Sequence, residues 1–269
     1  MARSEIKQVA GDAEHSAILR VPARVGFVVL GVMHILIGAI AISIAVGAGH
    51  AEADQSGAMS QLSHSPAGEA ALWAIGAGLF ALAAWQIVQA ILVPAPDPAK
   101  RWGKRVVDLA KALTYVVFGI TAVVFAVGGH KSTSGATKSL SASLIASPGG
   151  VYVVAAIGLT TIGVAVGFGV RGVTRSFRRR LSLPRAPWGS AIVALGSTGY
   201  LAKAVALAIV GVLFVVAAVT LNPKAASGLD GALKALMRLP YGEVVLWIVG
   251  AGLIAYGVFC MARAAFERL

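Results

Sequence analysis

The sequence predicts an all-α, polytopic membrane protein of six transmembrane helices, built as three parallel two-helix repeats in a pseudo-threefold arrangement. Three observations predict this fold class. Hydrophobic residues make up 58% of the chain and charged residues only 13%, and the mean hydropathy of +0.82 lies far outside the soluble range. The apolar residues form six blocks of about 20, which is the length of an α-helix that crosses a hydrocarbon core of about 30 Å. The same residues also recur at fixed offsets along the chain.

Stretches with charged residues and proline separate the six apolar blocks. A transmembrane β-barrel would alternate apolar and polar residues in segments of about ten, whereas these blocks are apolar on every face. The single cysteine, Cys260, excludes a disulfide within the chain, and we expect it to be a small packing residue. The expected spans are residues 25–46, 69–93, 107–127, 150–170, 195–221 and 241–261.

The basic residues predict the orientation. Sixteen Lys and Arg residues lie in the tails and in the loops after spans two and four, against five in the loops after the odd-numbered spans. The positive-inside bias therefore predicts that both termini, including the tail 1–23, are cytoplasmic. A cleaved signal peptide is the alternative for the first block, but this block is longer than an apolar region of 7 to 15 residues and belongs to the repeat.

The repeat becomes visible when three prolines are placed in register at offsets of 82 and 92, where Pro-x-Gly opens each even-numbered span. Leucines and glycines coincide at the same offsets, and glycines of the odd-numbered spans coincide at offsets of 81 and 92. Each unit crosses twice and ends where it began, so the repeats are parallel rather than inverted. We expect repeats at residues 24–99, 103–185 and 195–269. The coinciding residues are Pro66, Pro148 and Pro240; Leu62, Leu144 and Leu236; Gly76, Gly158 and Gly250; and Gly38, Gly119 and Gly211.

The outer loops repeat as well. In the third, Leu229, Leu233, Leu236 and Met237 fall at helical spacing. This spacing predicts a short amphipathic helix lying on the outer membrane surface, stopped by the following proline.

The third repeat opens with Gly-Tyr-Leu-Ala-Lys-Ala at residues 199–204, followed by a span with a central glycine, an outer Gly-Ala-Leu-x-x-Leu, Leu-Pro-x-Gly and a glycine-rich second span. This pattern resembles the actinobacterial membrane family called domain of unknown function 1206, which has the two-helix unit three times. The first and second repeats depart from the opening motif with Phe27-Val28-Val29 and Asp108-Leu109-Ala110. The resemblance implies a bacterial inner, or plasma, membrane but no activity and no catalytic residues.

Five residues form a candidate intramembrane polar site, because ionisable groups at membrane depth are costly. Asp108 and Lys111 are spaced i, i+3 and can pair, and Lys203 occupies the position of Lys111 in the third repeat. These three could form a solute or lipid-headgroup site, or the lysines could extend to the headgroups. His34, with Tyr115 as its equivalent in the second repeat, is expected to hydrogen-bond between helices.

The loop after the fourth span carries a candidate patch for anionic lipid headgroups, formed by Arg175, Arg178, Arg179, Arg180 and Arg185. Gly163 and Gly167, a small-xxx-small pair on the fourth span, are expected to pack tightly within the chain.

The sequence leaves the function open. It carries no recognisable catalytic, cofactor or metal motif, and the +12 charge is distributed for a bilayer rather than for nucleic acid. One hypothesis is a non-enzymatic scaffold or accessory subunit of an envelope or respiratory assembly, with a membrane-protein partner. The alternative is a small-solute or ion pathway, or a lipid-handling protein, lined by the polar residues of the repeats. Whether these residues face an axis, a partner helix or lipid would discriminate between the two.

Overall fold

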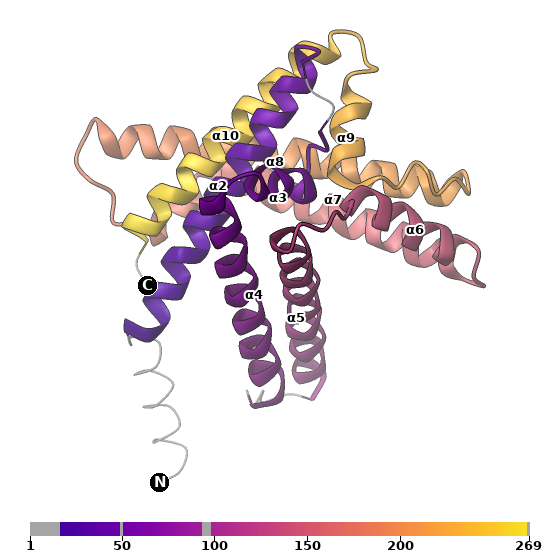
Figure 1. The fold of residues 1–269 in the computed structure, drawn as a ribbon, viewed down its shortest axis with the longest axis horizontal. Coiled ribbons are helices and arrows are strands. Elements are labelled where there is room, and N and C mark those ends of the chain that lie inside the picture. The colour runs from indigo at the N-terminus through magenta and orange to yellow at the C-terminus, as the bar shows by residue number, and fades with distance from the viewer. Residues whose placement is uncertain (1–16, 49–50, 93–97, 268–269) are drawn as a thin grey trace. The chain divides into compact units, whose positions relative to one another are not determined.

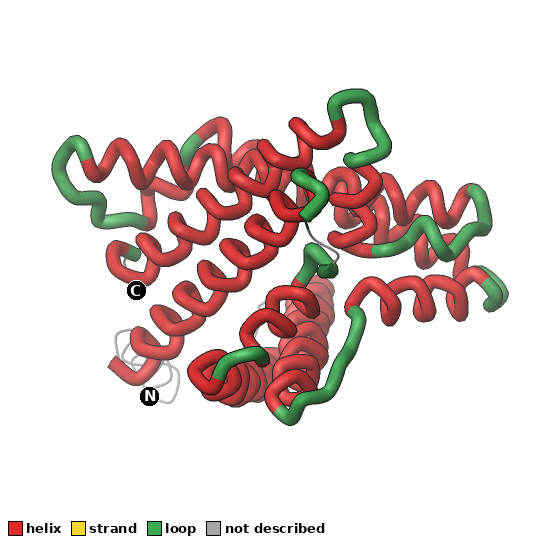
Figure 2. The backbone as a smooth tube through the Cα atoms, turned by 45° about the horizontal axis from the view of Figure 1, so that its top comes forward, coloured by secondary structure: helices red, strands yellow, loops and turns green. Residues whose placement is uncertain are grey.

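The computed structural model describes residues 17–48, 51–92 and 98–267, and these residues form helices and connecting loops without a β-strand (Figures 1 and 2). Six helices are long and apolar enough to cross a membrane. They are α2 (Ala17–Ala45), α4 (Pro66–Leu92), α5 (Pro98–Ala126), α7 (Gly150–Thr174), α8 (Trp188–Val219) and α10 (Gly242–Phe266). The all-helical, six-span fold class is therefore confirmed, and the chain is a multi-pass membrane protein.

Three spans begin well before the residue that the sequence predicts. Helix α2 starts at Ala17 rather than near residue 25, α5 starts at Pro98 rather than near 107, and α8 starts at Trp188 rather than near 195. With 32 residues, α8 is about 48 Å long and exceeds the hydrocarbon thickness. The added first turns of α5 are basic, so a hydropathy pattern does not include them, whereas those of α8 are mostly apolar.

One short helix connects the two spans of each repeat: α3 (Gln55–Ser63) in the first, α6 (Thr133–Ile145) in the second and α9 (Gly228–Leu236) in the third. The amphipathic helix expected in the third loop forms as α9. Its apolar face does not lie on the membrane surface, however, because Leu233 and Leu236 are buried against protein. Helix α9 packs against α6, α8 and α10, so the apolar stripe is part of the protein interior.

The chain divides into two compact units, residues 1–58 with 132–269, and residues 59–131. In the first unit α2 packs along α10, α7 packs along α8, and α8 contacts α10. The second unit is dominated by the α4–α5 pair. In each of the three pairs an even-numbered span lies against the odd-numbered span of the next repeat, and the last span pairs with the first.

Glycines that coincide in the repeat meet at all three helix pairs. A Cβ at Gly38 of α2 would lie 2.5 Å from the carbonyl oxygen of Gly250 in α10, and one at Gly158 of α7 would lie 2.8 Å from that of Gly211 in α8. The third pair, Gly76 and Gly119, is looser, at 3.5 Å. The repeated glycines therefore let the backbones of paired spans approach closely.

The repeated Leu and Pro-x-Gly also acquire a structural reason. In every repeat the glycine of Pro-x-Gly lies against the carbonyl oxygen of the repeated leucine near the end of the outer helix. The two are so close that a Cβ at the glycine would collide with this oxygen. The three pairs are Gly68 with Leu62, Gly150 with Leu144, and Gly242 with Leu236. This contact sets the tight turn from each outer helix into the following span.

Candidate functional site

His34 and Lys203 meet inside the first unit. His34 lies on α2 and Lys203 near the middle of α8, and the Lys203 Nζ is 3.1 Å from the His34 Nε2. The other ring nitrogen, Nδ1, is 2.8 Å from the carbonyl oxygen of Leu30 one turn earlier. Because an ammonium group can only donate, these distances assign the His34 proton to Nδ1, where it bonds to Leu30, and leave Nε2 to accept from Lys203.

Aromatic rings enclose the same ammonium group. The Lys203 Nζ lies 4.5 Å from the ring centroid of Tyr256 on α10 and 5.0 Å from that of Phe168 on α7, both within range of a cation–π interaction. The Tyr256 ring also packs against His34, with centroids 4.8 Å apart. The ammonium therefore turns into the bundle instead of extending to the headgroups, and helices from all three repeats surround it.

An aromatic cluster continues from this site toward the membrane side that carries the basic loops, called here the basic side. Phe177 stacks on Tyr200 at 5.2 Å between ring centroids and meets Phe259 edge-on at 4.9 Å. Cys260 is fully buried in this cluster. Its surroundings agree with the expected packing role.

In the second unit, Asp108 and Lys111 of α5 form the pair that their spacing predicts. The Lys111 Nζ is 3.0 Å from the Asp108 Oδ1. The two side chains differ in environment, because Lys111 is 48% exposed and Asp108 only 7%. The other carboxylate oxygen, Oδ2, is buried without a hydrogen-bond partner among the described residues. Tyr115 follows Lys111 one turn later on α5 and is half-buried.

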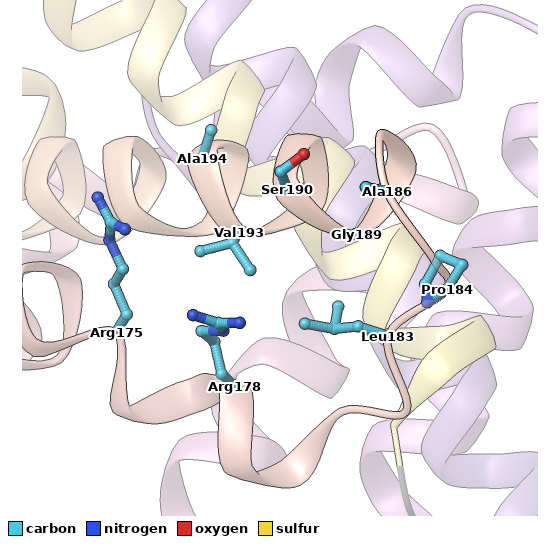
Figure 3. Close-up of a pocket in the computed structure, with 9 residues that line it drawn as sticks. All are labelled: Arg175, Arg178, Leu183, Pro184, Ala186, Gly189, Ser190, Val193 and Ala194. Carbon is cyan, nitrogen blue, oxygen red and sulfur yellow. The ribbon is translucent and has the colours of Figure 1, made fainter.

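Two of the five arginines of the predicted lipid patch line a pocket. Arg175 ends α7, and Arg178, Arg179 and Arg180 lie in a single 3-10 turn, η1 (Ser176–Arg180). Arg175 and Arg178 line a pocket of about 500 Å³ against the first turns of α8 (Figure 3). Arg179 and Arg185 are exposed outside the pocket, and the side chain of Arg180 is outside the described part of the chain.

A polar network on the opposite side was not predicted from the sequence. Asp54 precedes α3 and accepts hydrogen bonds from the backbone of Ser56 and Gly57 and from the hydroxyl groups of Ser56 and Ser134. Burial raises the pKa of Asp54 above its usual value, against the lowering effect of these donors. The sequence signal was available, since an Asp just before a helical segment is a strong N-cap.

A second carboxylate joins the loops of the first and third repeats. The backbone N–H of Ala53 donates to the Asp230 Oδ1 over 2.9 Å, and Lys234 binds the same carboxylate at 2.9 Å. The segment before α3 also reaches α6, because the N–H of Thr133 donates to the Ser56 hydroxyl over 3.1 Å. This network links the loops of all three repeats.

The arrangement offers hydrogen-bonding and electrostatic chemistry. The described residues hold no cluster of three or more His, Cys, Asp or Glu side chains that could bind a metal ion. The sequence did not predict the two aromatic residues beside Lys203, which are Phe168 and Tyr256. They carry no local signal, since aromatic residues are ordinary in apolar spans.

Comparison with known proteins identifies the family. A protein of Bacillus subtilis (strain 168) described as uncharacterized, YxxB, is 30% identical over 251 residues, which cover 91% of this chain and 90% of that protein. This match does not confirm a restriction of the family to actinobacteria. No solved structure matches the chain. The family model described as Domain of Unknown Function (DUF1206) matches three times, at residues 25–92, 109–175 and 198–267, each match containing one two-helix unit. The chain therefore belongs to the DUF1206 family, with three tandem copies of its repeat.

Proposed function

We propose that this protein is a non-enzymatic membrane scaffold, an accessory subunit that binds the transmembrane helix of a partner in an envelope or respiratory assembly. It acts in the plasma membrane with both termini in the cytoplasm, in agreement with the charge bias. The observation that carries the proposal is the contact between His34 and Lys203, because these polar groups of α2 and α8 bond to each other inside the chain. A residue that lines a solute path would instead offer its polar atoms to the path.

The outward face of α7 is the surface that we propose for the partner. The face of α7 that packs on α8 carries Gly158, Ala165 and Gly172. Gly163 and Gly167 point the opposite way, and no atom lies within 4 Å of where a Cβ would stand on either glycine. Within the first unit, neither glycine packs against another helix. Small residues on a transmembrane helix favour close approach of another helix.

The test compares Gly163→Leu with Val164→Leu, its exposed neighbour on the same helix. Tagged full-length protein is extracted from native membranes with a mild detergent, and copurifying membrane proteins are quantified. We expect Gly163→Leu to lose a specific partner several-fold while Val164→Leu retains it. Both variants should keep the thermal midpoint of the wild type, since neither position has a crowded environment.

Two results would contradict the scaffold proposal. If Gly163→Leu lowers the thermal midpoint, the face packs within the chain. If the protein lost from the preparation is a second, differently tagged copy of the same chain, the face joins identical subunits and no accessory role remains for it.

A small-ion pathway is the second candidate, and Asp108 favours it. A buried carboxylate oxygen without a partner among the described residues is unusual and can receive a proton or a cation. Ion or proton flux into liposomes that contain the purified protein tests this candidate. Flux that Asp108→Asn abolishes, without a change in thermal stability, would favour the pathway over the scaffold.

A further inference from the structure

We infer that the pocket between η1 and the start of α8 binds the phosphate group of an anionic phospholipid from the leaflet on the basic side of the membrane. The inference rests on a pair of guanidinium groups, on a helix terminus that lacks a cap, and on an apolar wall. All three belong to the same pocket in the first unit (Figure 3).

The guanidinium groups of Arg175 and Arg178 supply the positive charge. Figure 3 shows both side chains extending from the turn toward α8. Neither forms an ion pair with a carboxylate of the described residues. Guanidinium groups bind phosphate oxygens through two parallel N–H donors, so the two arginines that line this pocket give it the charge and the donors that a phosphate group requires.

The turn that carries these arginines is fixed to the bundle. Phe177, between the two arginines, is buried in the aromatic cluster, and Leu181 is buried just after η1. The next backbone N–H, that of Ser182, donates to the carbonyl oxygen of Phe266 over 2.8 Å. The backbone that carries the arginines is therefore held in place before a ligand arrives, which reduces the entropy that binding must overcome.

The opposite wall is the N-terminus of α8. Pro187 stands at the N-cap and provides no side-chain cap, and the backbone N–H groups of Gly189 and Ser190 belong to the first turn, where no helical acceptor exists. The hydroxyl of Ser190 donates to the carbonyl oxygen of Pro187. The N–H groups thus remain for an anion, and the helix dipole adds to the field of the arginines.

The remaining wall indicates a lipid rather than a soluble phosphate. Leu183, Val193 and Ala194 give the pocket an apolar side, and its volume of about 500 Å³ lies within the range of small-molecule sites. Trp188, beside the pocket, is 72% exposed, as tryptophans at a membrane interface are. A headgroup with its glycerol and first acyl carbons would use both the charged and the apolar wall.

The experiment uses the full chain in nanodiscs of phosphatidylcholine, with or without phosphatidylglycerol, and measures lipid binding by native mass spectrometry and by the shift of the thermal midpoint. The test variant is Arg175→Gln with Arg178→Gln. The control, Arg179→Gln with Arg185→Gln, removes the same charge from the same loop outside the pocket. A third variant, Ala194→Phe, fills the pocket without changing the charge.

We expect the wild type to retain phosphatidylglycerol and to gain thermal stability from it. The test pair should bind this lipid about 10- to 30-fold more weakly, in line with the field of two basic residues. Ala194→Phe should also weaken binding because it occupies the pocket, while the control pair binds as the wild type does. An equal loss in both arginine pairs would show a diffuse charge effect and overturn the inference. A free phosphate source is indicated, and the lipid overturned, if glycerol 3-phosphate stabilises the protein equally in pure phosphatidylcholine.

Discussion

An ammonium group enclosed by membrane helices needs an acceptor, and in this protein the acceptor is the ring nitrogen of a histidine. A buried ion pair is costly because two charges lose their hydration. A neutral imidazole accepts a hydrogen bond from the ammonium without the desolvation of a second charge. The rings of Tyr256 and Phe168 replace part of the lost hydration of Lys203. The contact therefore fixes α8 against α2, α7 and α10 at the depth of one side chain.

Removing the acceptor should cost more than removing the donor. We expect His34→Leu to destabilise the detergent-solubilised protein by about 2 kcal/mol or more, because the ammonium of Lys203 then stays buried without an acceptor. Lys203→Leu should cost less, since the neutral ring keeps its bond to Leu30. The double variant should recover part of the His34→Leu loss in thermal unfolding. Strictly additive losses would contradict the contact.

The Asp108–Lys111 pair predicts an opposite ranking of the two partners. Lys111 is half-exposed and can turn toward the headgroups or water, whereas Asp108 is buried and has no long apolar stem. We expect Lys111→Met to cost about 1–3 kcal/mol, because it leaves a buried carboxylate without a donor. Asp108→Asn should cost less than Lys111→Met, and the double variant should recover part of the Lys111→Met loss. Thermal unfolding of all four proteins measures this, and a smaller loss in Lys111→Met than in Asp108→Asn would contradict the ranking.

Asp54 makes stability depend on pH. Because burial raises the pKa of Asp54, the folded protein binds its proton more tightly than the unfolded chain does. The contribution of Asp54 to the free energy of unfolding therefore decreases as the pH rises from below the ordinary aspartate pKa of about 3.9 to the raised value, by about 1.4 kcal/mol for each pH unit between them. We expect Asp54→Asn to lack this decrease. Unfolding of both proteins from pH 3 to 7 measures the difference, and parallel curves would exclude it.

At the scale of helices, the glycines predict where a methyl group can be added. Gly38→Ala should lower the thermal midpoint, because its Cβ would lie 2.5 Å from the carbonyl oxygen of Gly250 and would separate α2 from α10. Gly163→Ala is the matched control on α7, with nothing within 4 Å. We expect this control to leave stability unchanged or to raise it by up to about 1 kcal/mol through helix propensity. Equal losses in both variants would indicate a general effect of glycine replacement instead of crowding.

How far these helices could be predicted depends on whether the cause is local. The pairing of Asp108 with Lys111 follows from helical spacing alone, and α9 follows from its apolar period. The coincidence of Gly38 with Gly211 along the repeat shows that the positions are equivalent, but it does not reveal that each meets a glycine of a different repeat. For the same reason the sequence could not predict that α9 is buried against protein or that no atom lies close to Gly163.

The candidate site shows the same limit. His34 and Lys203 were both candidates, but 169 residues separate them and no offset of the repeat relates them, so their contact is a product of tertiary packing. The five arginines were recognised as one run, whereas the single turn of η1 directs only Arg175 and Arg178 to the pocket. Side-chain direction within a short turn depends on where Phe177 is anchored, and that anchor lies on α8 and α10.

For the whole molecule, the span pairs follow one rule: each even-numbered span packs on the odd-numbered span of the next repeat, and the last span packs on the first. In each two-helix unit the first span packs against the preceding unit and the second span packs against the following one. Without a contact between the last and the first unit, one span of each would lack a partner. Pairing of α10 with α2 gives both of these spans a partner. Parallel repeats allow the last span to pair with the first as the other spans pair, because every copy has the same orientation in the membrane.

The orientation itself is the last prediction, since 16 basic residues against 5 assign the loop with Arg175 and Arg178 to the cytoplasm. Two matched serine-to-cysteine variants test it, Ser182→Cys in the basic loop and Ser139→Cys on α6, both at exposed positions. Cys260 is buried and can be replaced by Ala in both to remove background labelling. In intact cells an impermeant thiol reagent should label the cysteine at 139 and reach the one at 182 only after the membrane is permeabilised. The reverse pattern would invert the topology and would place the lipid pocket, together with the basic loops, in the outer leaflet, where fewer anionic headgroups would be available to it.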